Sequence, residues 1–257
     1  MLFRSLCADV GNTNIVLAAY RGDELIFTSR IKTDATLTRD QYAVDLHSLL
    51  EVYDITPNEF TGAIVGSVVP QLTTILSQAI EMALGCKCIA LVSGVKTGLN
   101  IAIDNPAECG ADLVAEAVGA KNHYPLPVIV VDMGTASKIV AVDAKGNFIG
   151  GSIMPGMRTS MNALIGSAAL LADFEFDTPK HAIGKNTIDC MRSGSVLGFA
   201  AMIDGMLDRF KKELGSDASV VATGGLVHYI LPSLRTKMVY REDLVTEGLR
   251  IIYEKNK

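Results

Sequence analysis

Residues 128–150 read "VIVVDMGTASKIVAVDAKGNFIG", and the same order of residue types occurs in "CADVGNTNIVLAAYRGDELI" at residues 7–26. In each stretch an apolar strand ends in an aspartate, a turn containing glycine follows, and a second apolar strand begins. When Asp132 is placed on Asp9, the glycines two residues later also coincide. The sequence therefore predicts a duplicated unit, with one carboxylate at the end of the first strand in each copy.

A tight turn follows the second strand in both stretches. Gly22-Asp23 and Gly146-Asn147 fall within one residue of each other when the copies are aligned. Glycine combined with Asn or Asp tolerates the positive φ that tight hairpins need. Each half is therefore expected to open with a meander of three antiparallel strands.

Helix signals follow the strands in both halves. Thr38 and Gln41 have the spacing of a capping box, and Pro70 and Gly85 mark the expected start and end of a second helix. In the second half the strand "SVVATGG" (residues 219–225) leads into another helix. The pattern predicts a mixed α/β unit in each half of the chain.

The paired carboxylates indicate a ligand. A buried aspartate costs several kcal/mol unless something compensates its charge. Equivalent strand ends in a duplicated α/β protein would face each other across a cleft, where such folds bind ligands. Asp9 and Asp132 would repel each other there without a cation, and carboxylate oxygens suit Mg²⁺ that accompanies a nucleoside triphosphate. Two aspartates that only cap strand ends are the alternative, which the second copy disfavours.

Composition limits the class of protein. The chain has 257 residues, of which 49% are hydrophobic and 20% charged, as in ordered globular proteins. The net charge of −5, without a basic cluster, disfavours nucleic acid as a partner. Because apolar runs stay below ~18 residues and no signal peptide is evident, no membrane association and a cytoplasmic location are expected. The five cysteines are interpreted as reduced, small hydrophobic residues.

The common nucleotide-binding motifs do not occur. The sequence contains neither a Walker A motif nor a Gly-x-Gly-x-x-Gly motif after a strand. The segment "ATGG" at residues 222–225 is a better candidate, because glycines at a strand end allow a base or ribose to approach the backbone.

Seven motifs occur in one order along the chain. They are "DVGNTN" (9–14), "TGLNI" (97–101), "NPAECGAD" (105–112), "VDMGTA" (131–136), "GGSIMPG" (150–156), "GKNT" (184–187) and "ATGGL" (222–226). Together they resemble the motifs of the type III pantothenate kinases, a family that belongs with acetate and sugar kinases, actin and the heat-shock chaperones. The resemblance implies an α/β fold of two duplicated actin-like (ribonuclease H-like) domains, 1–125 and 126–257, each a mixed five-stranded sheet flanked by helices. The active site would lie in the cleft between them.

The resemblance also implies an activity. Members of the family are homodimers that transfer the γ-phosphate of ATP to the 4′-hydroxyl of pantothenate, the first step of coenzyme A synthesis. They use Mg²⁺ and a monovalent cation, K⁺ or NH₄⁺. Phosphoryl transfer of this kind depends on positioning, charge neutralisation and one carboxylate that orients the attacking hydroxyl.

The resemblance assigns roles by position. Asp112 is similar to the general base, Asp9 would lie near Mg²⁺, and Asp132 would lie beside the monovalent cation. The expected ATP contacts are Asp9, Val10, Gly11, Asn12, Thr13, Asn14, Thr135, Thr223, Gly224 and Gly225. The expected pantothenate contacts are Ile103, Gly110, Ala111, Asp112, Leu113 and Thr187, the last delivered across the dimer interface.

Several residues depart from the family pattern. Leu113 stands where the family has an Arg that helps to hold pantothenate, and an aliphatic side chain cannot replace an Arg–carboxylate fork. Ile103 replaces an aromatic residue, Glu116 replaces an Asn, and Ser137-Lys138 replaces two threonines of the second turn. These changes concentrate at the acceptor site.

Two interpretations remain open. In the first, the acceptor is still pantothenate and Arg158, Lys138 or Lys185 supplies the missing positive charge. In the second, the chain is a paralogue that phosphorylates another acceptor or regulates without catalysis. Retention of Asp9, Asp112 and Asp132 favours a working phosphotransfer site. Glu108 and Glu116 are expected on the solvated face of a helix, and the apolar stripe of residues 188–214 is expected in a core or a dimer interface.

Overall fold

This computed structural model describes residues 4–168, 171–215 and 217–257. These residues form two compact units. Unit 1 takes the chain up to Leu99, Asp104–Asn122 and Asp243–Lys257, and unit 2 takes Asn100–Ile103 and His123–Glu242. The expected domain boundary between residues 125 and 126 stays a prediction. The structure adds that the C-terminal segment packs with unit 1.

Within the described residues, unit 1 contains a five-stranded sheet in the order β3-β2-β1-β4-β5. The first three strands are antiparallel neighbours, and β4 and β5 run parallel to β1. The elements of unit 1 are β1 (Arg4–Val10), β2 (Asn14–Arg21), β3 (Glu24–Lys32), α1 (Arg39–Val52), η1 (Pro57–Glu59), β4 (Phe60–Ser67), α2 (Pro70–Leu84), β5 (Cys88–Ala90), η2 (Pro106–Glu108), α3 (Ala111–His123) and α7 (Leu244–Glu254).

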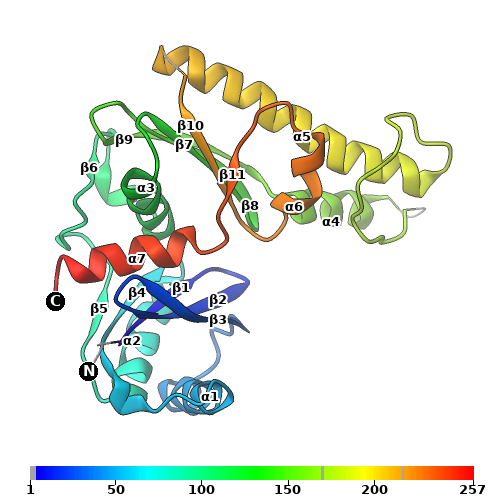
Figure 1. The fold of residues 1–257 in the computed structure, drawn as a ribbon. Helices are drawn as coiled ribbons and strands as arrows, with labels where there is room; N and C mark the ends of the chain where they lie inside the picture. Colours follow the sequence, from blue (N-terminus) through cyan, green and yellow to red (C-terminus); the bar gives the residue numbers. More distant parts are fainter. Residues whose placement is uncertain (1–3, 169–170, 216) are drawn as a thin grey trace. The chain divides into compact units, whose positions relative to one another are not determined.

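Alternation along β1 separates the two faces of this sheet. Leu6, Ala8 and Val10 belong to the core formed with α1 and α2. Successive residues of a strand point to opposite faces, so Asp9 lies on the other face, which α7 covers (Figure 1). Gly66 of β4 makes room there, because a Cβ atom on it would lie 2.9 Å from Leu249 Cδ2 of α7.

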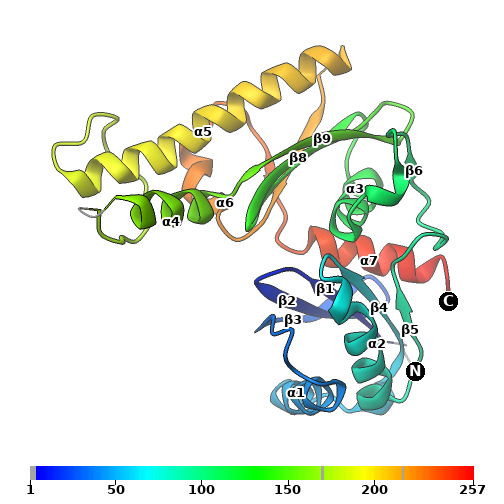
Figure 2. The ribbon, with the colours of Figure 1, turned by 180° about the vertical axis from the view of Figure 1, so that it is seen from behind.

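Helices α3 and α7 pack closely through glycines. A Cβ atom on Gly119 of α3 would lie 2.6 Å from the carbonyl oxygen of Leu244, and one on Gly248 would collide with the carbonyl oxygen of Ala115. Because neither glycine carries a side chain, the two backbones approach each other directly (Figure 2). This contact fixes α3, and with it the residues at its N-terminus.

In the part of unit 2 that the structure describes, the sheet has the order β11-β10-β7-β8-β9-β6. Ile129, Val131 and Met133 of its central strand β7 face a core formed with α4, α5 and α6. Asp132 therefore lies on the opposite face. The elements of unit 2 are β6 (Asn100–Ile101), β7 (Val128–Met133), β8 (Ala136–Val142), β9 (Asn147–Pro155), α4 (Met157–Ser167), α5 (Thr187–Leu214), β10 (Ser219–Thr223), α6 (Val227–Ile230), η3 (Leu231–Ser233) and β11 (Val239–Tyr240).

The two sheets repeat the same order. Strands β3-β2-β1-β4-β5 correspond to β9-β8-β7-β10-β11, with the same parallel and antiparallel pairs. Even the irregularity of the ladder recurs, between Ala19 and Tyr20 in β2 and between Ala141 and Val142 in β8. The predicted duplicated α/β fold is confirmed.

The second sheet differs from the predicted five strands by a sixth, β6. This strand consists of Asn100 and Ile101, which pair with the start of β9. The Asn100 amide also donates to Asn147 Oδ1 at 2.9 Å, and the backbone N–H of Ala102 donates to the Phe148 carbonyl at 2.7 Å. These bonds extend the sheet by a segment too short to carry a strand pattern in the sequence.

Local helix signals are confirmed. Thr38 and Gln41 form a reciprocal capping box at the start of α1, and Gly85 ends α2 with φ of 67°. The apolar stripe predicted over residues 188–214 lies on α5, in which Ile203 and Leu207 are buried. Among the described residues, none of the helices combines the length and the apolar character that a membrane crossing requires.

Candidate functional site

The first predicted site residues form a turn at the end of β1. The backbone N–H of Gly11 donates to the Asn14 carbonyl at 3.0 Å, which closes the turn. Thr33 at the end of β3 donates its hydroxyl to the Gly11 carbonyl at 2.7 Å. Asn12 and Thr13 are exposed at the tip, and Asp9 is half-buried beneath it. The turn thus presents backbone and short polar side chains above a carboxylate.

Helix α3 begins beside this strand end. Asp9 of β1 pairs directly with Gly66 of β4. A Cβ atom on Gly66 would lie 3.7 Å from the Cβ atom of Ala111, the first residue of α3. Val68, just after β4, donates its N–H to the Val10 carbonyl at 3.0 Å. Unit 1 therefore brings Asp9 and the start of α3 to the same edge and face of its sheet.

Asp112 lies in the first turn of α3, half-buried. Its Oδ1 accepts the N–H of Leu113 at 2.8 Å. A Cβ atom on Gly110 would lie 2.5 Å from that same oxygen, so a side chain there would displace the carboxylate. A helix N-terminus favours a carboxylate electrostatically. Burial raises the pKa of the neighbouring Cys109 thiol to about 11, and the Asp112 and Glu116 carboxylates add to this increase.

One prediction about α3 was wrong. Glu116 was expected on a solvated face, but only 1% of it is exposed. The reason is the close packing of α3, whose residues from Val114 to Ala120 are all buried. Glu108 is exposed, as expected, and accepts the Asn105 amide at 2.8 Å.

The second carboxylate, Asp132, meets a lysine. Asp132 of β7 lies directly across from Lys138 of β8, and the Lys138 Nζ lies 2.6 Å from Asp132 Oδ2. Both side chains are only 13% exposed. Gly134 and Gly224 line the same carboxylate, since Cβ atoms on them would lie 3.5 Å and 2.6 Å from Asp132 Oδ1. The sequence reasoning did not anticipate this pair, although the tight turn between the two residues is a signal for it.

Two of the predicted ATP contacts of unit 2, Thr223 and Gly224, adjoin this carboxylate. Thr223 of β10 is buried and pairs with Asp132 across the ladder. Gly224 follows with φ of 95°, and Gly225 is exposed. Thr135 lies exposed at the tip of the β7–β8 turn, and its carbonyl accepts the Thr159 hydroxyl at 2.8 Å.

The remaining predicted acceptor residues lie elsewhere in unit 2. Ile103 is half-buried near Gly150, and Thr187 is exposed at the first position of α5. Thr187 lines a groove of about 410 Å³ between α4 and α5, together with apolar residues such as Met161 and Met191. Ile103 follows β6 and Thr187 begins α5, whereas Asp132 lies on β7, so the three residues belong to different elements of unit 2.

The basic side chains considered for the acceptor are differently placed. Lys138 is engaged by Asp132. The Arg158 guanidinium lies 4.2 Å above the Phe176 ring and 3.7 Å from Asp173 Oδ1. Lys185 is exposed in the segment before α5.

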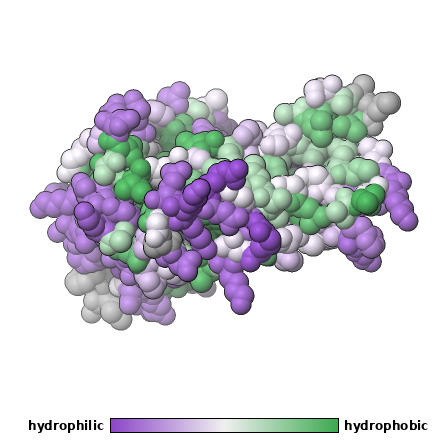
Figure 3. All heavy atoms as spheres, turned by 90° about the horizontal axis from the view of Figure 1, so that it is seen from above, coloured by the Kyte–Doolittle hydropathy of each residue, from purple (hydrophilic) through white to green (hydrophobic). Residues whose placement is uncertain are grey.

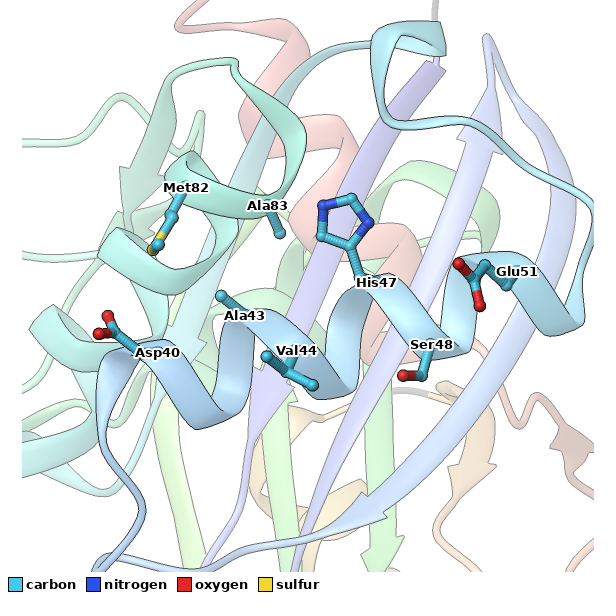
Figure 4. A pocket seen from close by; sticks show the side chains of 8 residues that line it. All are labelled: Asp40, Ala43, Val44, His47, Ser48, Glu51, Met82 and Ala83. Carbon is cyan, nitrogen blue, oxygen red and sulfur yellow. The ribbon is translucent and has the colours of Figure 1, made fainter.

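Another hollow lies between α1 and α2 in unit 1. It measures about 350 Å³, and Ala43 and His47 of α1 and Met82 of α2 are among its lining residues (Figure 4). No predicted site residue lines it. Within the described chain, no three His, Cys, Asp or Glu side chains come together as metal ligands.

Comparison with known proteins gives a consistent result. The family model described as type III pantothenate kinase matches residues 5–209. A type III pantothenate kinase of an Exiguobacterium species is 43% identical over 251 residues, which is 98% of each chain. That of Moorella thermoacetica is 41% identical over 98% of this chain and 99% of its own.

Solved structures extend the likeness at the level of the fold. A putative Baf family transcriptional activator from Campylobacter jejuni superimposes with a TM-score of 0.63 at 18% identity, over 98% of each chain. The ROK hexokinase from Thermus thermophilus gives 0.53 at 13% identity, over 97% of each chain. These likenesses confirm the predicted actin-like fold.

Proposed function

The chain belongs to the type III pantothenate kinase family, and we propose that it transfers the γ-phosphate of ATP to the 4′-hydroxyl of pantothenate. The product would be 4′-phosphopantothenate, the first intermediate on the way to coenzyme A. One observation carries the proposal beyond family membership: α3 begins beside the end of β1, so that Asp112, in its first turn, belongs to the same strand end as Asp9.

The exposed turn after β1 suits the phosphates of ATP. Asn12 and Thr13 are exposed at its tip and present backbone and short polar side chains, and phosphates favour such backbone sites. We assign Val10, Asn14, Thr135, Thr223, Gly224 and Gly225 to the same nucleotide. The motifs that support this assignment occur in both units.

Asp9 fits Mg²⁺. Mg²⁺ bound with a nucleotide usually takes one or two carboxylates, and phosphate oxygens and water complete its shell. A single half-buried carboxylate below a phosphate-binding turn meets that requirement. When bound, the ion would neutralise charge on the phosphates.

Asp112 would act as the general base. Its carboxylate is half-buried and fixed by the Leu113 N–H at the start of α3. It would take the proton of the 4′-hydroxyl as the new P–O bond forms and the bond between the γ-phosphorus and ADP breaks. Gly110 lies against this carboxylate, since a Cβ atom on it would lie 2.5 Å from Asp112 Oδ1, and a base held in place in this way contributes through positioning.

The acceptor site departs from the family pattern, because Leu113 replaces the arginine of the family. Leu113 is half-buried at the start of α3, and its aliphatic side chain has no donor for the carboxylate of pantothenate. Ile103 also departs from the pattern. The second candidate function, phosphorylation of another acceptor or ATP-dependent regulation without catalysis, rests on these residues.

A homodimer is part of the proposal. The groove between α4 and α5 is lined largely by apolar residues, and Thr187 lies in it. Leu164, Ile183 and Ile188 are 42–84% exposed in and near these helices, and Figure 3 shows hydrophobic surface on the part of unit 2 that α4 and α5 form. We also propose a cytoplasmic location, where free thiols such as those of the five cysteines persist.

A coupled assay of ADP release tests the proposed function. The protein is incubated with Mg²⁺ and ATP, and pantothenate is compared with a panel of small hydroxyl acceptors. Release that depends on pantothenate is expected. Release with another acceptor alone would support the paralogue. A shift of the melting temperature with ATP, but no release with any acceptor over hours, would support the regulator.

The role of Leu113 can be tested separately. If pantothenate is the acceptor and is weakly held, Leu113→Arg should lower its KM about tenfold, the value of one good charge-assisted contact. Leu113→Met, which adds no charge, is the control. An unchanged KM in Leu113→Arg would indicate that the acceptor site is built around another group.

A further inference from the structure

A lysine ammonium occupies the place at Asp132 that the family resemblance gives to a monovalent cation. The Lys138 Nζ lies 2.6 Å from Asp132 Oδ2, the separation of a charge-assisted hydrogen bond. The two residues face each other directly across the β7–β8 ladder. The pair is therefore fixed by the register of the hairpin.

The surroundings leave this pair little freedom. Asp132 and Lys138 are each 13% exposed. Gly224 closes one side of the carboxylate, because a Cβ atom there would lie 2.6 Å from Asp132 Oδ1 and from the Met133 backbone nitrogen. Gly134 closes another side at 3.5 Å. A lysine held between strands in this way lacks the mobility of a surface side chain.

A second cation does not fit beside this lysine. K⁺ or NH₄⁺ at the same carboxylate would place two positive charges within a few ångströms in a partly buried site, where like charges repel strongly. The ammonium already supplies one positive charge and N–H donors toward this side of the nucleotide site. The residues present therefore disagree with the cation that the family implies.

We propose that Lys138 serves as a built-in cation and makes this kinase independent of K⁺ and NH₄⁺. The inference rests on the proposed function and adds to it. The ε-ammonium of Lys138 neutralises Asp132 and stands beside the Thr135 turn, where the phosphates of ATP are expected. No exchangeable monovalent ion is needed at this position.

The first experiment measures ADP release with pantothenate, or with whichever acceptor supports release, in different salts. Chlorides of K⁺, NH₄⁺, Na⁺ and tetramethylammonium are compared at about 0.1 M, so that screening is equal. Rates within about twofold of one another are expected, since Lys138 provides the charge in every salt. An increase of about tenfold or more with K⁺ or NH₄⁺ over tetramethylammonium would overturn the inference.

The second experiment removes the ammonium. Lys138→Met should lower the rate in tetramethylammonium about tenfold or more, and K⁺ should restore part of it, because Asp132 can then accept an external cation. Lys138→Arg keeps the charge and should stay independent of K⁺. Lys145→Met, in the exposed β8–β9 turn, is the matched control and should behave as the parent protein.

A binding measurement covers the case in which Lys138→Met is inactive. The melting temperature is recorded with K⁺ and with tetramethylammonium. K⁺ should raise it for Lys138→Met and leave it unchanged for the parent protein and Lys145→Met. A K⁺-dependent rise in the parent protein would contradict the inference. Absence of ADP release in every salt with every acceptor would instead count against the proposed function, and the melting data would still test the cation site.

Discussion

The strand ends that carry Asp9 and Asp132 occupy the same position in two sheets of the same order, yet they meet different neighbours. Across from Asp9 on β2 is Val16, which has no charge, whereas across from Asp132 on β8 is Lys138. Helix α3 begins beside the first strand end, while a glycine turn closes over the second. The repeat thus supplies one frame, in which the cross-strand position holds an apolar residue beside Asp9 and a lysine beside Asp132.

The largest expected effect tests the chemistry of the first strand end. Asp112→Asn should lower kcat about 10²-fold or more and leave the Kd for ATP nearly unchanged, because a general base acts mainly in the transition state. Kinetics of ADP release and calorimetry with ATP measure the two quantities. Asp45→Asn, on the exposed side of α1, is the control. Unchanged turnover in Asp112→Asn would show that another group takes the proton.

The second prediction concerns the stability of the other strand end. Asp132→Asn leaves the mostly buried Lys138 charge without its carboxylate and should lower the free energy of unfolding by about 3 kcal/mol. Urea unfolding measures this difference. Asp173→Asn removes an exposed carboxylate 3.7 Å from Arg158 and should cost less than about 1 kcal/mol. Equal losses would mean that the Lys138 pair is no more important than a surface pair.

A smaller effect is expected from the glycine that closes over Asp132. Gly224 and Gly22 both have positive φ, 95° and 65°, so alanine is strained at either position. Only Gly224 also has close neighbours, the Asp132 carboxylate and the Met133 backbone, whereas nothing lies within 4 Å of a Cβ atom on Gly22. Gly224→Ala should therefore cost about 2 kcal/mol and Gly22→Ala about 1 kcal/mol. If urea unfolding gave the same loss of unfolding free energy for both variants, the inference that Gly224 packs tightly against Asp132 would be wrong.

The smallest effect is expected for a variant that copies the arrangement at Asp132 to the strand end of Asp9. Val16→Lys places an ammonium across from Asp9, at the register position that Lys138 has relative to Asp132. The new charge should compete with Mg²⁺ and raise the KM for Mg²⁺–ATP about tenfold. Val16→Met adds comparable length without charge and should change the KM little. If both variants gave the same KM, Asp9 would not be a cation ligand.

Much of the fold could be read from local residue patterns. The repeat of Asp-x-Gly, the hairpin glycines and the capping box of Thr38 and Gln41 all correspond to observed elements. Such signals act through neighbours a few residues apart, so that the sequence alone contains the relevant partners. Strand β6 was not predicted, because two residues carry no periodic pattern and their position depends on pairing with β9.

The environment of individual site residues was harder to predict. Glu116 is charged, as residues on the solvated face of a helix usually are. Helix α3 is packed so closely, however, that Glu116 is buried. Lys138 was considered only as a source of charge for the acceptor, and its pairing with Asp132 depends on the register of the β7–β8 hairpin. Both outcomes depend on which residues the fold brings into contact.

Residue order was sufficient to establish a duplicated α/β protein of the type III pantothenate kinase family, since periodicity, turn chemistry and motif order are properties of the chain itself. The folded structure was needed to show that Asp132 is paired with Lys138 and that α3 brings Asp112 to the strand end of Asp9. Charge compensation and burial depend on distances between residues that are separated in the sequence. Those distances are set when strands pair and helices pack.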